Sequence, residues 1–429
     1  MKKFLLVLAL LAVLVVPTMS IGAQDSVNLV LWHAKQDAEG DALLALLDAF
    51  VEANPNITVE QVFNPSGTLQ DSFVAAAGAG EGPDMARVTN FDAFKGFYLD
   101  LRPLVEDAAY WEASFAPGVL AALRSGEEDA DALYGFPNQF TVTGPFINRT
   151  LFEQAGIEVP SDSNDAVTWA EWTEVTRQVA EATGTEFAIG IDRTGHRFAG
   201  PAFSEGATFF NEDGSITIDT PGFRSFAETL VGWHTDGITP AEVWIGSGGS
   251  YAAAADYFIN AQLVMYMSGS WQIGRFSNDI GDAFDWAAVP NPTGEGGSTG
   301  MPGGTMMVAS GDTEYPAEVA RVMDYLASVD ALKEFSERTL FIPAHLGLGE
   351  LDFQTDVEAA RAALETFAAE VPKLSDQAYQ LQFGGQAFAI NNPIRDRLTQ
   401  VLTGELSLDD AIARIQQDVD DALAAAAAG

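Results

Sequence analysis

Between residues 27 and 88 the chain alternates between strand-like and helix-like segments, and this alternation restricts the fold more than any other feature. Residues 27–32, 57–63 and 85–88 are short, apolar or alternating, and typical of strands. Apolar side chains recur at helical spacing between the strands, first up to the stop at Pro55 and then in residues 69–77, where Thr68 is expected to cap the helix. Three strands joined by two helices predict a parallel sheet with right-handed crossovers.

A second unit of the same kind begins near residue 146. Thr168 and Glu171 form a capping-box pattern that predicts the start of a helix, and residues 187–191 read as a strand followed by a polar loop over residues 192–197. Two such units predict an α/β protein with two lobes and a cleft between them. Ligands of open parallel sheets bind beyond the carboxyl ends of the strands, so the residues directly after each strand are candidate contacts.

Residues 290–304 hold six glycines and three prolines, a composition that predicts a loop or a connection between lobes. This stretch contains Gly296-Gly297-Ser298-Thr299-Gly300, which matches the GxSxG pattern of a serine nucleophile. No clear strand precedes it and no clear helix follows it, although the nucleophile elbow requires both. We therefore do not expect Ser298 to be catalytic.

The chain is strongly acidic, with 61 Asp and Glu residues against 21 Lys and Arg residues and a net charge of −40. This charge disfavours nucleic acids and anionic membranes as partners and indicates a heavily solvated acidic surface. The absence of cysteine rules out disulfides and thiolate metal ligands, and the four histidines are too dispersed in sequence to indicate a metal site. No cofactor is expected.

Residues 1–23 have the pattern of a secretory signal peptide. Two lysines precede an uncharged run over residues 4–16, and small residues at 21–23 offer a cleavage site. The run is too short to cross a bilayer as a helix. We expect an exported periplasmic or extracellular protein, and the lack of a cysteine after the cleavage site predicts that it carries no lipid anchor.

Several short motifs occur in a characteristic order along nearly all of the mature chain. They lie at residues 29–32, 54–59, 82–85, 134–137, 147–157, 168–172, 214–221 and 267–271. Each is weak alone, but their order and spacing resemble extracellular solute-binding protein family 1, the carbohydrate ABC transporter class that includes maltose-binding protein. The resemblance implies a type II periplasmic-binding-protein fold, in which two lobes, each a sheet flanked by helices, are joined by a hinge of three chain crossings.

The resemblance also implies where the lobes and the crossings lie. The N-terminal lobe would comprise residues 24–141 and 304–352, and the C-terminal lobe residues 142–303 and 353–429. The crossings would fall near residues 140–143, 300–306 and 349–356.

Candidate ligand contacts follow from the resemblance and from positions after strands. Trp271, in a glycine-x-tryptophan turn, is expected to stack against a sugar ring, and Trp244 is expected to be an aromatic residue on an exposed loop. The remaining candidates are Trp32, His33, Gln36, Arg87, Asn90, Asp92, Asp192, Arg193, His196, Gly303, Gly304, Asn391 and Arg395.

The function implied by the resemblance is non-catalytic. A sugar or oligosaccharide would bind in the cleft between the lobes, and the loaded protein, expected to be a monomer, would deliver it to an ABC transporter permease. Two alternatives stay open at this point. One is a secreted polysaccharide-degrading enzyme, and the other is a protein that binds a polyamine or another cation on a similar scaffold.

Overall fold

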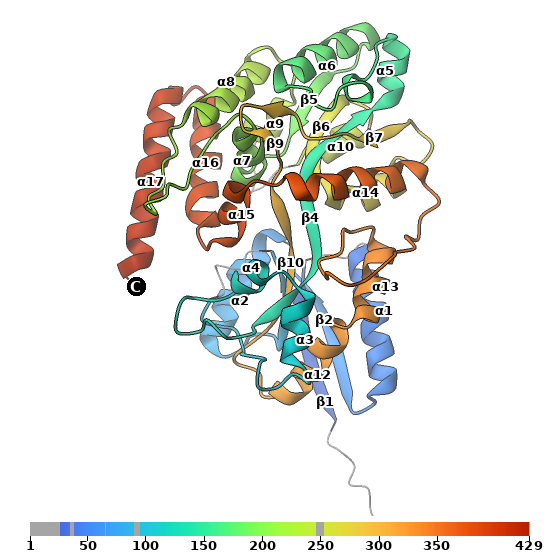
Figure 1. Cartoon of the computed structure of the whole chain (residues 1–429), viewed down its shortest axis with the longest axis vertical. Coiled ribbons are helices and arrows are strands. Elements are labelled where there is room, and N and C mark those ends of the chain that lie inside the picture. Colours follow the sequence, from blue (N-terminus) through green and yellow to red (C-terminus); the bar gives the residue numbers. More distant parts are fainter. Residues whose placement is uncertain (1–25, 35–37, 65, 90–94, 246–252, 429) are drawn as a thin grey trace, which may run out of the picture.

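The structure is a computed structural model that describes residues 26–34, 38–64, 66–89, 95–245 and 253–428 (Figure 1). The strands are β1 Val27–His33, β2 Ile57–Phe63, β3 Met85–Val88, β4 Gly135–Asn148, β5 Phe187–Ile191, β6 Leu263–Gly269, β7 Trp286–Ala288, β8 Thr293–Gly294, β9 Gly297–Ser298 and β10 Pro302–Ala309. The α-helices are α1 Ala38–Ala53, α2 Ser66–Ala79, α3 Ala108–Ser114, α4 Pro117–Ala121, α5 Arg149–Ala155, α6 Trp169–Thr183, α7 Gly195–Ser204, α8 Pro221–Thr235, α9 Ala241–Ile245, α10 Ala255–Ile259, α11 Ile273–Asp279, α12 Pro316–Leu326, α13 Val329–Thr339, α14 Glu358–Glu370, α15 Asp376–Phe383, α16 Ala387–Leu402 and α17 Leu408–Ala428.

The main sheet runs through both lobes in the order β2-β1-β3-β10-β4-β6-β5, with β7 also paired to β4. Strand β1 pairs in parallel with β2 and β3, and β5 pairs in parallel with β6, which confirms the parallel units expected from the sequence. The long strand β4 joins the two halves, because it pairs with β10 up to residue 142 and with β6 from residue 143 onward. In Figure 1 this strand runs vertically from the lower lobe into the upper one.

Each lobe has its own apolar core. In the lower lobe of Figure 1 the core gathers residues from β1, β10, α1, α12 and α13, such as Leu31, Met307 and Phe335. The larger core of the upper lobe gathers residues from β5, β6, α6, α14 and α16, such as Ile189 and Met265. The chain crosses between these cores within β4, again near the start of β10, and a third time between α13 and α14.

Local signals in the sequence placed most of these elements well. The expected strands at β1, β2, β3 and β5 are confirmed, as is the capping box that begins α6, in which Thr168 and Glu171 bond each other's backbone N–H groups. The expected cap at Thr68 is wrong, because the backbone is already helical from Ser66. The residues expected to form a loop over 192–197 are partly helical, since Thr194 caps α7 and the helix begins at Gly195.

The glycine-proline stretch is more ordered than its composition suggests. Residues 293–298 form the β8–β9 hairpin, and residues 302–304 are the first part of β10 rather than a loop. At Gly304 the backbone angle φ is +145°, and a side-chain carbon there would lie 2.4 Å from the carbonyl oxygen of Gln139. Gly303 has similarly little room, since a side-chain carbon would lie 2.8 Å from Oγ1 of Thr141. Glycine is therefore needed here for β10 to pack closely against β4.

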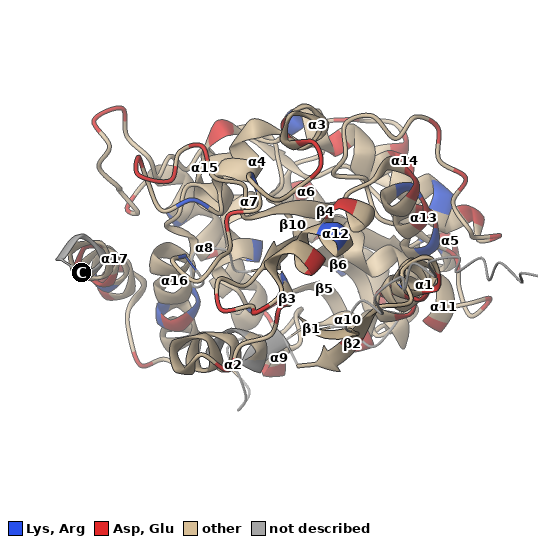
Figure 2. Cartoon of the chain, turned by 90° about the horizontal axis from the view of Figure 1, so that it is seen from below, with Lys and Arg blue, Asp and Glu red and all other residues tan. Residues whose placement is uncertain are grey.

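Acidic residues are spread over loops and helices throughout the molecule, with the few basic residues interspersed among them (Figure 2). This distribution agrees with the expectation of a solvated acidic surface. Within the described ranges, every helix lacks the combination of length and apolar character that a bilayer-spanning segment needs. The expected signal peptide at residues 1–23 lies outside the described residues and stays a prediction.

Candidate functional site

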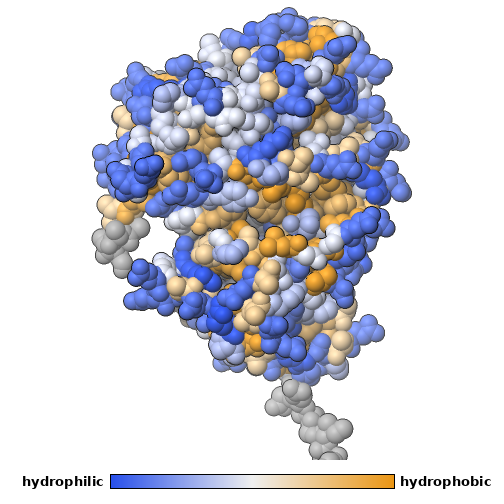
Figure 3. Space-filling model, in the orientation of Figure 1, coloured by the Kyte–Doolittle hydropathy of each residue, from blue (hydrophilic) through white to orange (hydrophobic). Residues whose placement is uncertain are grey.

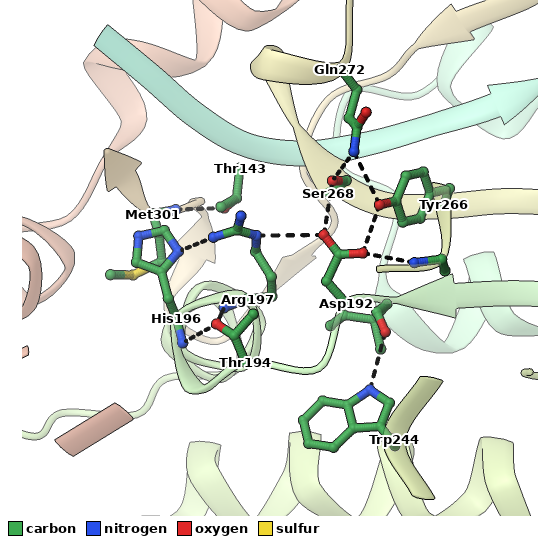
Figure 4. Close-up of polar contacts among 12 residues, drawn as sticks. Thr143, Asp192, Thr194, His196, Arg197, Trp244, Tyr266, Ser268, Gln272 and Met301 are labelled. Atoms are coloured by element: carbon green, nitrogen blue, oxygen red, sulfur yellow. Dashed lines mark hydrogen bonds and ion pairs between the residues drawn. The ribbon is translucent and has the colours of Figure 1, made fainter. Parts of the chain in front are cut away.

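The candidate site lies at the carboxyl ends of β5 and β6, beside the strands that cross between the lobes. The two strands are parallel and Ile191 pairs with Met267, so the residues that follow them, Asp192 and Ser268 to Trp271, lie close together. Figure 3 shows that the surface is hollowed between the two lobes, with apolar residues along the hollow. Figure 4 shows the polar residues that this arrangement brings together.

Asp192 is the buried centre of the site. Its side chain has no exposed surface, and its Oδ1 accepts hydrogen bonds from the hydroxyl of Tyr266 at 2.6 Å and from the backbone N–H of Ala254 at 3.0 Å. Its Oδ2 accepts from Oγ of Ser268 at 3.1 Å. Burial raises the pKa of Asp192, and the positive charge of Arg197 is the largest influence in the opposite direction.

Arg197 links Asp192 to Trp271. Its Nε lies 3.7 Å from Oδ2 of Asp192, and its guanidinium carbon lies 4.0 Å from the ring centroid of Trp271, a cation–π contact. Only 16% of the Arg197 side chain is exposed. The residue occupies the first turn of α7, where the hydroxyl of Thr194 accepts a hydrogen bond from its backbone N–H.

His196 connects the same turn to the hinge. Its Nε2 lies 3.0 Å from the carbonyl oxygen of Pro302 on β10, and its Nδ1 lies 2.8 Å from Nη1 of Arg197. Because a carbonyl oxygen can only accept and a guanidinium can only donate, the proton of the ring must be on Nε2. Burial, followed by the charge of Arg197, lowers the pKa of His196 to about 3, so the ring is neutral at ordinary pH.

Trp271 belongs to the C-terminal lobe but reaches the other one. It lies in the short 3-10 helix Ser270–Gln272 directly after β6, and it packs as a partly buried residue against the core of the N-terminal lobe. A side-chain carbon at Gly269 would lie 2.0 Å from Cζ3 of the indole, so the absence of a side chain at Gly269 makes room for the ring. Trp271, Asp192 and His196, three of the candidates predicted from sequence, therefore share Arg197 as a common partner.

Two of the predicted contacts are corrected by their burial. Trp244 was expected on an exposed loop, but it lies on α9 with no exposed surface and donates from Nε1 to the carbonyl oxygen of Ile191 at 3.1 Å. Asp192 was expected to contact ligand, but protein groups surround both of its carboxylate oxygens. A side chain without exposed surface cannot contact a ligand in this conformation.

Arg87 also differs from the expectation. Its side chain is only 3% exposed, and Nη2 lies 2.6 Å from Oε2 of Glu39 and 2.6 Å from Oε1 of Gln139. Its guanidinium lies 5.6 Å from the ring centroid of Phe335, in the core of the N-terminal lobe. Arg87 is thus part of a buried polar network inside that lobe rather than an accessible ligand contact.

The other candidates are distributed around the hinge and the helices. Trp32 is partly buried and meets Phe73 edge to face with ring centroids 6.5 Å apart, and His33 is buried.

Arg193 donates from Nε to Oγ1 of Thr399 at 3.2 Å. Arg395, on α16, is engaged by its neighbours Asp396 and Asn392. Asn391 packs its backbone against Gly195 at the start of α7, and Gln36, Asn90 and Asp92 lie outside the described residues.

The sequence interpretation missed Arg197, Tyr266 and Ser268. Tyr266 and Ser268 alternate on β6, so both polar groups point to the same side of the strand and toward Asp192. That alternation inside an otherwise apolar strand was the signal that could have identified them. Arg197 could have been found only by recognising Thr194 as a helix cap.

Nothing in the described part of the chain indicates a hydrolytic centre at the GxSxG pattern. Ser298 lies in the β8–β9 hairpin, and its hydroxyl donates to the carbonyl oxygen of Asn291 at 2.7 Å. Among the described residues there is also no group of three His, Asp or Glu side chains placed to hold a metal ion. A separate open hollow of about 570 Å³ lies around Arg177, Glu186 and Asp236 and shares no residue with the candidate site.

Comparison with known proteins gives consistent matches. Residues 34–333 match the family model described as bacterial extracellular solute-binding protein. The chain is 25% identical over 233 residues to YcjN of Escherichia coli (strain K12), an ABC transporter periplasmic-binding protein by name, and the match covers 51% of this chain and 52% of that relative, about half of its length. It is also 25% identical over 327 residues to the arabinooligosaccharide-binding protein of Halalkalibacterium halodurans, covering 73% of this chain and 70% of that one.

The fold has close counterparts among solved structures. The GacH receptor of Streptomyces glaucescens, solved unliganded and in complex with acarbose, superposes with a TM-score of 0.75 at 21% identity. The superposition covers 92% of this chain and 97% of that one. At this level of identity the likeness establishes the two-lobed α/β fold.

Proposed function

Because the chain belongs to the family of bacterial extracellular solute-binding proteins, we propose that it captures a sugar or oligosaccharide between its lobes and delivers it to an ABC transporter permease. The observation that carries the proposal is the position of Trp271, an aromatic residue held by one lobe and packed against the core of the other. An indole can cover the apolar C–H face of a sugar ring while neighbouring polar groups bind its hydroxyls. Contacts to both lobes would favour the closed conformation.

The proposed lobes are residues 24–141 with 304–352, and residues 142–303 with 353–429. The division is supported by the two apolar cores, which draw on these same parts of the chain with few exceptions, such as Leu340 and Ile342 in the C-terminal core. We further propose that residues 1–23 direct export and that the mature protein acts as a monomer.

Sugar is the favoured class of ligand for two reasons. A relative of this chain is named as an arabinooligosaccharide-binding protein, and the candidate site combines an aromatic ring with several hydrogen-bonding groups. We propose that the protein performs no chemical step on the sugar. The GxSxG pattern was the one sequence feature that suggested hydrolysis, and the hydroxyl of its Ser298 donates a hydrogen bond to the carbonyl oxygen of Asn291, just before the β8–β9 hairpin.

A thermal-shift screen with isothermal titration of the hits tests the proposal. The panel contains arabinotriose, maltotriose, lactose and spermidine, each incubated with the full mature chain and then analysed for cleavage products. A ligand at one hundred times its Kd should stabilise the native state by about 2.7 kcal/mol. Stabilisation by a sugar without product formation is expected, and Trp271→Ala should abolish it.

Other outcomes of the same screen would contradict the proposal. Release of smaller sugars would point to the enzyme alternative, and stabilisation by spermidine alone would point to cation binding. The matched control is Trp286→Phe, since Trp286 is a buried aromatic residue of the C-terminal core on β7. This variant should lower the melting temperature but keep the sugar-dependent shift.

A further inference from the structure

Arg197, which was not among the candidates predicted from sequence, stacks on the ring of Trp271. We propose that Arg197 binds the sugar together with Trp271 as one unit, and that Asp192 and His196 are positioning residues for this unit. The inference rests on the proposed function, because it assumes that a sugar binds at Trp271.

The first step of the argument is the stack between the two side chains. With its guanidinium carbon 4.0 Å from the ring centroid, Arg197 covers one face of the Trp271 indole. In the proposed unit the sugar packs on the part of the indole that Arg197 leaves uncovered, close enough for its hydroxyl groups to reach the guanidinium. Both side chains keep some exposed surface, 16% in the case of Arg197, so both are within reach of the same ligand.

The second step concerns what holds Arg197 in place. Asp192 has no exposed surface, and a buried carboxylate is costly unless it is paired and hydrogen-bonded. Tyr266 and Ser268 supply hydrogen bonds and Arg197 supplies the opposite charge. A buried acid at this position is best explained by a requirement to fix the guanidinium above the indole.

His196 restrains the other end of the guanidinium. Its neutral ring accepts from Nη1 of Arg197, and its Nε2 is held by the carbonyl oxygen of Pro302. Arg197 is thus fixed by Asp192, by His196 and by the indole before any ligand arrives. Such preorganisation reduces the conformational entropy that a ligand would otherwise have to offset on binding.

The chemistry of the unit indicates which ligand it suits. A guanidinium presents a planar set of N–H donors and no acceptor, so it matches two adjacent oxygen atoms of a ligand. Asp192 offsets its charge, so the site does not need an anionic group from the ligand. The unit therefore fits a neutral sugar with neighbouring hydroxyl groups, with the indole against its C–H face.

A double-mutant cycle tests the inference. Wild-type protein, Arg197→Lys, Trp271→Phe and the double variant are titrated calorimetrically with the sugar of the panel that binds the wild type most tightly. Arg197→Lys keeps the charge but loses the planar stack, and we expect it to lower affinity about tenfold or more. The double variant should lose clearly less than the product of the two single losses, because both variants disrupt the same unit.

The positioning residues need a readout that a loss of stability alone would not change. The difference in fluorescence emission between each protein and its Trp271→Phe counterpart isolates the signal of Trp271. Asp192→Asn and His196→Gln should alter this signal in the folded, ligand-free protein and should also lower sugar affinity. Arg224→Lys is the control: Arg224 lies on α8, where it forms an exposed ion pair with Asp219, and this variant should change neither quantity.

The outcomes separate this inference from the proposed function. If the wild type binds no sugar of the panel, the proposed function is overturned and the inference with it. If the wild type binds but Arg197→Lys binds within twofold of it, or if the two single losses multiply, the inference alone is overturned. An unchanged Trp271 signal in Asp192→Asn would overturn the positioning role of Asp192.

Discussion

The imidazole of His196 donates a hydrogen bond from Nε2 to the carbonyl oxygen of Pro302 at 3.0 Å, and so joins helix α7 of the C-terminal lobe to the strand β10 that crosses between the lobes. The bond requires the proton on Nε2 and leaves Nδ1 as the acceptor for Arg197. Protonation of Nδ1 would replace this acceptor by a donor that faces a guanidinium. The neutral ring is therefore part of the folded structure.

This arrangement predicts a specific dependence of stability on pH. The pKa of His196 falls from an ordinary value of 6.5 to about 3 on folding, so below pH 6.5 the unfolded chain binds a proton that the folded chain does not. The contribution of neutral His196 to the free energy of unfolding is fully present above pH 6.5 and is lost as the pH falls toward 3. Between pH 7 and pH 5 the loss should be about 2 kcal/mol.

Urea unfolding of wild-type protein and of His196→Gln at both pH values measures this loss. The many carboxylates titrate in both proteins, so the difference between their pH profiles isolates the histidine. We expect the wild type to lose about 2 kcal/mol more than the variant over this range. Parallel profiles would show that the ring is protonated in the folded state or accessible to solvent.

The close approach of β10 to β4 predicts that Gly304→Ala is strongly destabilising. The variant combines an unfavourable φ of +145° with a side-chain carbon 2.4 Å from the carbonyl oxygen of Gln139. We expect a loss of about 2 to 4 kcal/mol in the free energy of unfolding. Gly404→Ala is the matched control, because Gly404 has φ of +77° but open space around it, and it should cost about 1 kcal/mol. Equal losses would mean that the packing against Gln139 can relax.

Much of the fold could be predicted from sequence because its signals are local. The apolar residues that indicate α1 lie within a few positions of one another, and so do Thr168 and Glu171 of the capping box. Both signals were interpreted correctly. Strand β5 was recognised in the same way from its short apolar run. Such patterns depend on the periodicity of the backbone and need no knowledge of the other lobe.

The site was harder to predict because its contacts join distant segments. Arg87 lies near the end of β3 and was expected to reach a ligand, but its partner Glu39 lies 48 residues earlier in the chain. Trp244 stands between Pro240 and a serine-glycine stretch, which suggested an exposed loop, yet its indole is covered and bonded to Ile191. Trp271 and His196 were separate candidates, and the structure shows that each contacts Arg197, whose position depends on the exact start of α7.

Contact between the lobes at α15 predicts an effect on closure. Phe383 at the end of α15 packs against an apolar cluster of the N-terminal lobe that includes Phe73 and Leu123, whereas Ala378 and Leu381 of the same helix belong to the core of the C-terminal lobe. We expect the closed, sugar-bound conformation to keep this contact, so removing the ring should weaken that conformation and, with it, sugar binding by about fivefold.

Small-angle scattering and calorimetric titration of Phe383→Ala test this effect. The variant should have a larger radius of gyration than the wild type when both are loaded at equal sugar concentration below saturation. Phe388→Ala, at a position that is 39% exposed on α16, is the control and should behave like the wild type. Unchanged affinity in Phe383→Ala would show that this contact does not contribute to closure.

The ion pair between Arg87 and Glu39 predicts that removing its acidic partner strongly lowers the stability of the protein, even when no ligand is present. The charged groups lie 2.6 Å apart and both side chains are at least nine-tenths buried, so Glu39→Ala leaves the guanidinium buried with less compensation. We expect a loss of about 3 to 5 kcal/mol in the free energy of unfolding, measured in urea. Asp162→Ala removes the partner of Arg149 from an exposed pair with the same 2.6 Å separation and should cost less than about 1 kcal/mol. Similar losses in the two variants would mean that water reaches Arg87, and that its predicted role as a ligand contact should be reconsidered.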